Sequence, residues 1–105
     1  MPAMELRAAT LQLAEQLIRF ESTADHPNQI TTCLESIEIY LRSSGLVLRR
    51  HERAGSPSLV VTFAETMRPA VFLNGHIDVV PGNRDQFEPR VGNDRLYGRG
   101  AIDMK

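Results

Sequence analysis

The sequence predicts an α/β fold in which two helices precede a series of strands. Apolar residues recur at helical spacing twice within the first 45 residues, and the spacing then changes to that of short strands. The last third is rich in glycine and other turn-forming residues. A hydrophobic fraction of 42% with 24% charged residues is typical of a folded domain, which excludes disorder along the whole chain.

The first predicted helix covers residues 4–20. Its apolar face is formed by Leu6, Ala9, Leu13, Leu17 and Phe20, with Leu11 and Ile18 beside it. The stretch TADHPN interrupts this pattern, and Pro27 suits the first turn of a second helix. That second helix places Ile30, Cys33, Leu34, Ile37 and Leu41 on one face. Gly45 is expected to end it.

Strand patterns follow the second helix. Residues 46–52 and 58–63 read as two strands, and the RAGSP turn between them predicts a β-hairpin. A third apolar run, residues 70–73, predicts another strand that leads into NGHIDVVPG. Beyond Pro81 we expect loops and turns, so the elements make the beginning of a layered α/β architecture.

Charge and cysteine content exclude several classes of protein. Twelve Lys and Arg residues against 13 Asp and Glu give a net charge of −1, which lacks the basic excess of proteins that bind nucleic acid or anionic membranes. The single cysteine, Cys33, cannot form an internal disulfide. No apolar run approaches the ~18 residues of a membrane span, and charged residues interrupt any signal-peptide core near the N-terminus. We therefore expect a cytoplasmic protein with no membrane or nucleic-acid partner.

Two segments of the last third carry candidate chemistry. His76 and Asp78 stand two positions apart at the end of the third predicted strand, so their side chains should point to one side. A histidine that binds a metal usually needs a second group on its other ring nitrogen, and a carboxylate two residues away can supply it. Asp103 follows the turn-forming Gly98 and Gly100, and a carboxylate can bridge two cations. Taken alone, His76 and Asp78 are more often an ordinary pair at a strand end.

Other candidate residues have simpler interpretations. His26 and His51 are expected on the solvated surface, and Cys33 in the core. The arginines around His51 are too few to indicate nucleic-acid binding. The run from Gly98 to Gly100 lacks the third glycine of a dinucleotide-binding loop, and Asp103 would repel a pyrophosphate at that place.

The two segments together resemble a known enzyme family. NGHIDVVPG followed by LYGRGAIDMK is similar to both N-terminal signatures of the zinc-dependent exopeptidases and deacylases, and QFEP between them matches that family's aromatic-proline stretch. The family includes acetylornithine deacetylase, succinyl-diaminopimelate desuccinylase, aminoacylase and the glutamate carboxypeptidases. The resemblance covers residues 70–105, with one departure at Asn93 and Asp94, where many relatives have Asp-Gly. Both pairs form turns, so we expect no functional consequence.

The resemblance implies a role for each candidate residue. His76 corresponds to a metal ligand, Asp78 to the catalytic-site carboxylate that orients this histidine, and Asp103 to the aspartate that bridges two metal ions. Two Zn²⁺ ions per complete active site are implied, with Co²⁺ or Mn²⁺ as substitutes. The family's general-base glutamate, its remaining metal ligands and its lid domain have no counterpart among residues 1–105.

The resemblance also implies a fold and an activity for a longer protein. Residues 1–105 would be the N-terminal portion of a three-layer α/β/α catalytic domain with a mixed sheet. The complete enzyme would be a metallopeptidase or amidohydrolase, a homodimer in some relatives, that cleaves the amide bond of N-acyl amino acids or small peptides. This chain alone would be inactive. The alternative is a truncated, inactive remnant or a binding module that keeps the metal motif.

Overall fold

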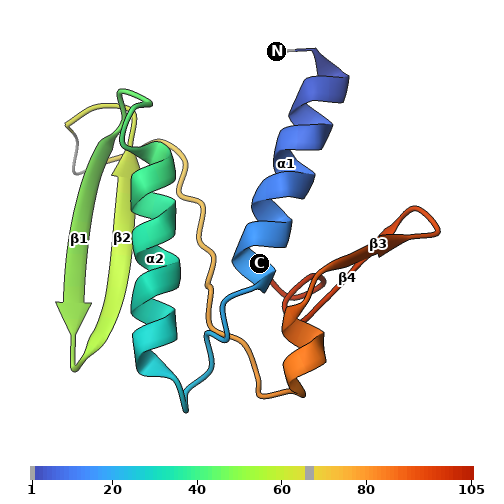
Figure 1. The fold of residues 1–105 in the computed structure, drawn as a ribbon. Helices are drawn as coiled ribbons and strands as arrows, with labels where there is room; N and C mark the ends of the chain where they lie inside the picture. Colours follow the sequence, from blue (N-terminus) through green and yellow to red (C-terminus); the bar gives the residue numbers. More distant parts are fainter. Residues whose placement is uncertain (1, 66–67) are drawn as a thin grey trace.

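The computed structural model describes residues 2–65 and 68–105 and contains helices and antiparallel strands (Figure 1). The elements in order are α1 (Ala3–Ile18), α2 (Pro27–Leu41), β1 (Val47–Arg53), β2 (Ser56–Thr62), the 3₁₀ helix η1 (Arg84–Phe87), β3 (Arg90–Gly92) and β4 (Arg95–Tyr97). This mixture agrees with the α/β class that the sequence predicts. No helix in the described part of the chain is both long and apolar enough to span a membrane.

The two helices form where the apolar spacing predicts them, but α1 buries a different residue. Pro27 occupies the first turn of α2, and Gly45 lies in the turn after this helix with φ of +81°. Along α1, Leu6 of the expected face is 58% exposed, whereas Ile18 is completely buried. The first turns of α1 lie apart from the other elements (Figure 1), whereas the rest of the expected face is partly buried, at Ala9, Leu13, Leu17 and Phe20.

The predicted hairpin is confirmed. β1 and β2 pair antiparallel from Val47 opposite Thr62 to Arg53 opposite Ser56. Ala54 and Gly55 form the two-residue turn, and both have positive φ, which suits the right-handed twist of the paired strands.

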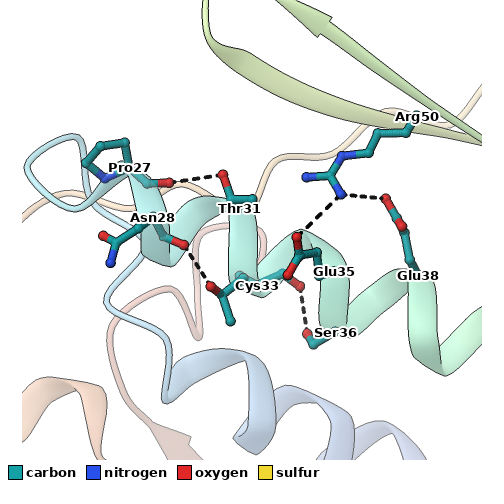
Figure 2. A network of polar contacts seen from close by, with 9 residues as sticks. Pro27, Asn28, Thr31, Cys33, Glu35, Ser36, Glu38 and Arg50 are labelled. Carbon is teal, nitrogen blue, oxygen red and sulfur yellow. Dashed lines mark hydrogen bonds and ion pairs between the residues drawn. The ribbon is translucent and has the colours of Figure 1, made fainter.

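Helix α2 lies alongside this hairpin, and an arginine of β1 links the two elements. Figure 2 shows the Arg50 guanidinium between two carboxylates of α2, 3.6 Å from Glu35 and 3.5 Å from Glu38. Pro57, Leu59 and Thr62 of β2 are partly buried, as expected for a hairpin with part of its surface against a helix. The hairpin and α2 therefore form one packed unit.

The third predicted strand is not formed in the described structure. Residues 70–73 run without strand partners, and both described sheets are two-stranded and antiparallel. A strand needs a neighbouring ladder for its backbone groups, and none lies beside this run among residues 2–65 and 68–105. Val71, Phe72 and Leu73 consequently remain exposed. The mixed sheet and the three-layer arrangement stay predictions.

A second hairpin forms in the region where only turns were expected. β3 and β4 pair antiparallel with Arg90 opposite Tyr97 and Gly92 opposite Arg95. Asn93 and Asp94 make its turn with φ of 52° and 58°, a conformation that asparagine and aspartate tolerate better than most residues. The turn was recognisable in the sequence, but strands of three residues are too short to give a periodic signal.

The core is small, and its residues come from the end of α1, the middle of α2 and η1. Its buried apolar side chains are Ile18, Cys33, Leu34 and Phe87. Ser22 and Thr23, in the linker between α1 and α2, are buried as well. The two segments that carry the candidate chemistry are attached to this core, as described next.

Candidate metal centre

The first candidate segment is extended, and its side chains alternate between two environments. His76 and Asp78 are exposed, whereas Ile77 and Val79 are half-buried. This alternation places His76 and Asp78 on the same side, as the sequence predicts, although the segment is not paired as a strand. The half-buried residues attach the segment to the protein through Ser22, whose hydroxyl donates to the Ile77 carbonyl at 2.7 Å.

The surroundings of the His76 ring determine which nitrogen carries hydrogen. The Asp78 carbonyl oxygen lies 3.0 Å from Nδ1, and the Asp78 carboxylate lies 3.3 Å from the same nitrogen. A carbonyl oxygen only accepts hydrogen bonds, so Nδ1 must be the donor. In the neutral ring, Nε2 then has no hydrogen and presents a lone pair. The Asp78 carbonyl is thus the nearer partner of Nδ1, with the carboxylate of the same residue next to it.

The second candidate segment brings Asp103 to that lone pair. Gly100, with φ of +93°, begins a tight loop in which the backbone N–H groups of Asp103 and Lys105 both donate to the Gly100 carbonyl, at 3.2 and 3.0 Å. This loop places Asp103 Oδ1 3.4 Å from His76 Nε2. A hydrogen bond between these atoms would be shorter, at about 2.7–3.2 Å. In the neutral ring with hydrogen on Nδ1, the Nε2 lone pair and the Asp103 carboxylate therefore face each other at this distance.

The gap has the size that a metal ion would need. Two ligand atoms on one tetrahedral zinc ion, with bonds of about 2.0–2.2 Å, lie roughly 3.3–3.6 Å apart. The observed 3.4 Å fits this separation, and imidazole nitrogen with carboxylate oxygen is a donor set that zinc accepts. Within residues 2–65 and 68–105, no group of three or more His, Cys, Asp and Glu side chains is arranged to hold a metal. The described residues therefore contribute two facing donors.

A second pair of ionisable side chains, Cys33 and Lys105, lies close to the attachment of the Asp103 loop. Burial raises the pKa of the Cys33 thiol, and the nearby Lys105 ammonium partly opposes this effect. Burial lowers the pKa of Lys105, and Cys33 partly opposes that shift. Lys105 Nζ donates to the Phe20 carbonyl at 2.7 Å, so the residue after Met104 is tied to the end of α1.

A network of hydrogen bonds links the two candidate segments on the side of η1. Gln86 Oε1 accepts from the backbone N–H of Asn83 and from Arg99 Nη2, each at 2.8 Å. The Arg99 backbone N–H donates to the Gln86 carbonyl at 2.7 Å. Asn83 directly follows the first segment, and Arg99 lies in the second. This link could not be predicted from the sequence, because an isolated glutamine or arginine has no characteristic spacing.

The remaining candidate residues lie outside this arrangement. His26 is hydrogen-bonded to Thr23 Oγ1 at 2.9 Å in the linker between the helices. His51 is exposed on β1 opposite Ser58. Cys33 is a buried free thiol, as expected for a core cysteine. These positions agree with the interpretations made from the sequence.

Comparison with known proteins identifies the class to which this arrangement belongs. Residues 72–105, which include all three candidate site residues, match the model of the peptidase family M20/M25/M40. The chain belongs to this family, as its two sequence signatures predict.

Curated relatives with the name succinyl-diaminopimelate desuccinylase are similar over much of this chain. The Thiobacillus denitrificans protein is 35% identical over 95% of the chain, the Dinoroseobacter shibae protein 39% over 69%, and the Azoarcus sp. protein 37% over 91%. These alignments cover 26%, 21% and 26% of the respective relatives. The chain therefore spans about a quarter of the length of the curated relatives that it matches.

Proposed function

We propose that this chain supplies the first metal-binding segments of a two-metal hydrolase that cleaves the amide bond of an N-acyl amino acid or small peptide. His76 and Asp103 are the proposed metal ligands, and Asp78 orients His76. One observation carries the proposal: His76 Nε2 faces Asp103 Oδ1 at 3.4 Å while the Asp78 carbonyl lies 3.0 Å from Nδ1. Two electron-pair donors at this distance repel each other unless a cation or a proton lies between them.

Each residue has a distinct task in this proposal. The Asp78 carbonyl accepts the Nδ1 hydrogen, with the Asp78 carboxylate 3.3 Å from the same nitrogen, and this keeps the Nε2 lone pair directed at the metal position. The Asp103 side chain is 76% exposed, so a substrate can approach it, and its two oxygens suit a bridge between two ions. Zn²⁺ is the favoured ion, with Co²⁺ or Mn²⁺ as substitutes. When bound, such ions supply Lewis-acid chemistry and lower the pKa of water.

The names of the relatives support an acylated amino acid as the substrate. They are desuccinylases, so an N-succinyl amino acid is the first substrate to test. A net charge of −1 supports a small-molecule substrate rather than nucleic acid. A cytoplasmic location and a homodimeric complete enzyme are further parts of the proposal. The general base and the other metal ligands are proposed to lie in a longer protein.

The proposal includes the architecture around the described elements. Residues 1–105 would form the N-terminal portion of a three-layer α/β/α domain with a mixed sheet. Val71, Phe72 and Leu73 support it, because they are 74%, 74% and 90% exposed and belong to a run with a strand-like sequence but no partner in the described structure. Apolar residues so exposed are normally covered in a complete domain.

Calorimetric titration with Zn²⁺ and an assay with N-succinyl and N-acetyl amino acids test the proposal on this chain. We expect weak zinc binding and no hydrolysis, because catalytic zinc usually has three protein ligands and this chain offers two facing donors. His76→Ala and Asp103→Ala should each abolish the weak binding. His51→Ala, which removes an exposed histidine of β1, should leave it unchanged.

Two results would contradict the proposal. Zinc binding that persists in both His76→Ala and Asp103→Ala would mean that these residues are not the ligands. Tight binding of two zinc ions with measurable hydrolysis by residues 1–105 alone would show that these residues already contain all the ligands and the base. That would contradict the proposal that the base and the other ligands lie in a longer protein.

An inactive protein that retains the metal motif is the alternative, and the small number of facing donors favours it. The gene region that follows the codon for Lys105 distinguishes the two. An open frame that encodes a Glu-Glu pair and a later histidine supports the enzyme, whereas a stop codon supports the inactive form.

A further inference from the structure

We infer that the linker between α1 and α2 positions both halves of the candidate metal centre, with Ser22 and Lys105 as positioning residues. The inference rests on the function proposed above for His76 and Asp103. The linker lies far from both segments in the sequence. Even so, Ser22 is hydrogen-bonded to the first segment and Phe20 to the second.

Ser22 holds the first segment on both sides of Asp78. Its hydroxyl donates to the Ile77 carbonyl at 2.7 Å, and its own carbonyl accepts from the Val79 N–H at 2.9 Å. Ser22 has no exposed surface, so water does not compete for these bonds. The two bonds fix the orientation of the peptide groups next to Asp78. The Asp78 carbonyl, which sets the tautomer of His76, is thereby held in place.

Lys105 holds the second segment to the same linker. Its Nζ donates to the Phe20 carbonyl at 2.7 Å, just beyond the last turn of α1, where carbonyl groups lack helical partners and favour a cation. The ammonium also lies 5.9 Å from the centre of the Phe87 ring. The lysine side chain packs so closely on Gly100 that a Cβ there would lie 2.7 Å from Lys105 Cδ. The loop that carries Asp103 is thus clamped at both of its ends.

The two attachment points are close together along the chain. Phe20 and Ser22 are two residues apart, and two extended residues span at most about 7 Å. Both segments are therefore attached to the same short stretch, residues 20–22, which is partly buried. The separation of His76 Nε2 and Asp103 Oδ1 depends on these two attachments, and loosening either one should let that gap vary.

The tautomer of His76 in the metal-free chain gives a readout that does not depend on the proposed activity. Long-range ¹H–¹⁵N NMR of ¹⁵N-histidine-labelled protein, with His76→Ala used to assign the signal, should show hydrogen on Nδ1 in the wild type. Ser22→Ala should produce a mixture with the Nε2–H form. Ser36→Ala is the matched control, because Ser36 also donates to a backbone carbonyl, that of Cys33, and this bond lies within α2. An unchanged His76 signal in a folded Ser22→Ala protein would overturn the role of Ser22.

Co²⁺ titration followed by its visible absorption tests the effect on the gap itself. Ser22→Ala and Lys105→Met should each weaken Co²⁺ binding about 10-fold, the lower end of the effect of removing groups that orient metal ligands. The double variant should weaken Co²⁺ binding by less than the product of the two single effects, because both residues control the same distance between His76 Nε2 and Asp103 Oδ1. Equal affinity in the wild type, Ser22→Ala and Lys105→Met would overturn the inference.

Failure of the inference and failure of the proposed function give different results. If wild-type Co²⁺ binding is insensitive to His76→Ala, the proposed function fails, and the NMR comparison still decides whether Ser22 sets the His76 tautomer. If Ser22→Ala does not fold, Ser22→Cys takes its place, because a thiol keeps the size of the side chain and donates a weaker hydrogen bond. A folded Ser22→Cys protein with the same His76 signal as the wild type would also contradict the inference.

Discussion

Replacing Gly98 by alanine should destabilise the protein through one identifiable contact. A Cβ at position 98 would lie 2.6 Å from Ile18 Cγ2 and 3.2 Å from Ile18 Cδ1. Ile18 is completely buried at the end of α1, so it has little space in which to move. Gly98 itself is not in the positive-φ region, and the backbone therefore accepts alanine without strain. The effect should come from packing alone.

The expected cost is that of one extra carbon atom in a filled space, about 1–3 kcal/mol in the free energy of unfolding. Each kcal/mol lowers the melting temperature of a domain of this size by roughly 4–8 °C. Gly92→Ala provides the control, because position 92 also avoids positive φ and has no atom within 4 Å of the added Cβ. Replacing glycine by alanine also lowers the conformational entropy of the unfolded chain. This stabilising effect is the same in both variants and cancels in the comparison.

Urea unfolding followed by circular dichroism measures the difference between the two variants. Gly98→Ala should be less stable than Gly92→Ala, and Ile18→Ala combined with Gly98→Ala should lose less stability than the sum of the single changes. Equal stability of Gly98→Ala and Gly92→Ala, within about 0.5 kcal/mol, would refute the packing of the Asp103 segment on Ile18.

Two further predictions concern groups close to the candidate site. Gln86→Ala should lower the free energy of unfolding by about 0.5–1.5 kcal/mol, because the Asn83 N–H and the Arg99 guanidinium lose their shared acceptor, whereas Gln86→Glu keeps that acceptor and should be close to the wild type. Similar urea midpoints for both variants would contradict this. Since burial raises the pKa of Cys33 above its ordinary 9.0, the wild type should lose stability as the pH rises above that value: the unfolded thiol ionises there and the folded one stays protonated. Cys33→Ala should not show this loss, so parallel pH profiles of the two proteins would rule out the contribution of the thiol.

Local patterns in the sequence were enough to predict both helices, the first hairpin and the candidate residues, but not the second hairpin. The apolar spacing of α1 and α2, the turn between β1 and β2, and the pair His76 and Asp78 all depend on residues a few positions apart. The chain's membership of the peptidase family likewise follows from two continuous signatures between residues 70 and 105. Interactions over such short separations are dictated by backbone geometry and residue type.

The tertiary structure decided which of these groups meet. Ile18 is fully buried and Leu6 exposed because α1 packs more closely toward its C-terminal end, and residues 70–73 stay unpaired because no strand lies beside them in the described structure. The 3.4 Å between His76 and Asp103, and the attachment of both segments to residues 20–22, join parts of the chain that are distant in sequence. Such contacts depend on how the whole chain packs, whereas the sequence around each residue determines only its local conformation.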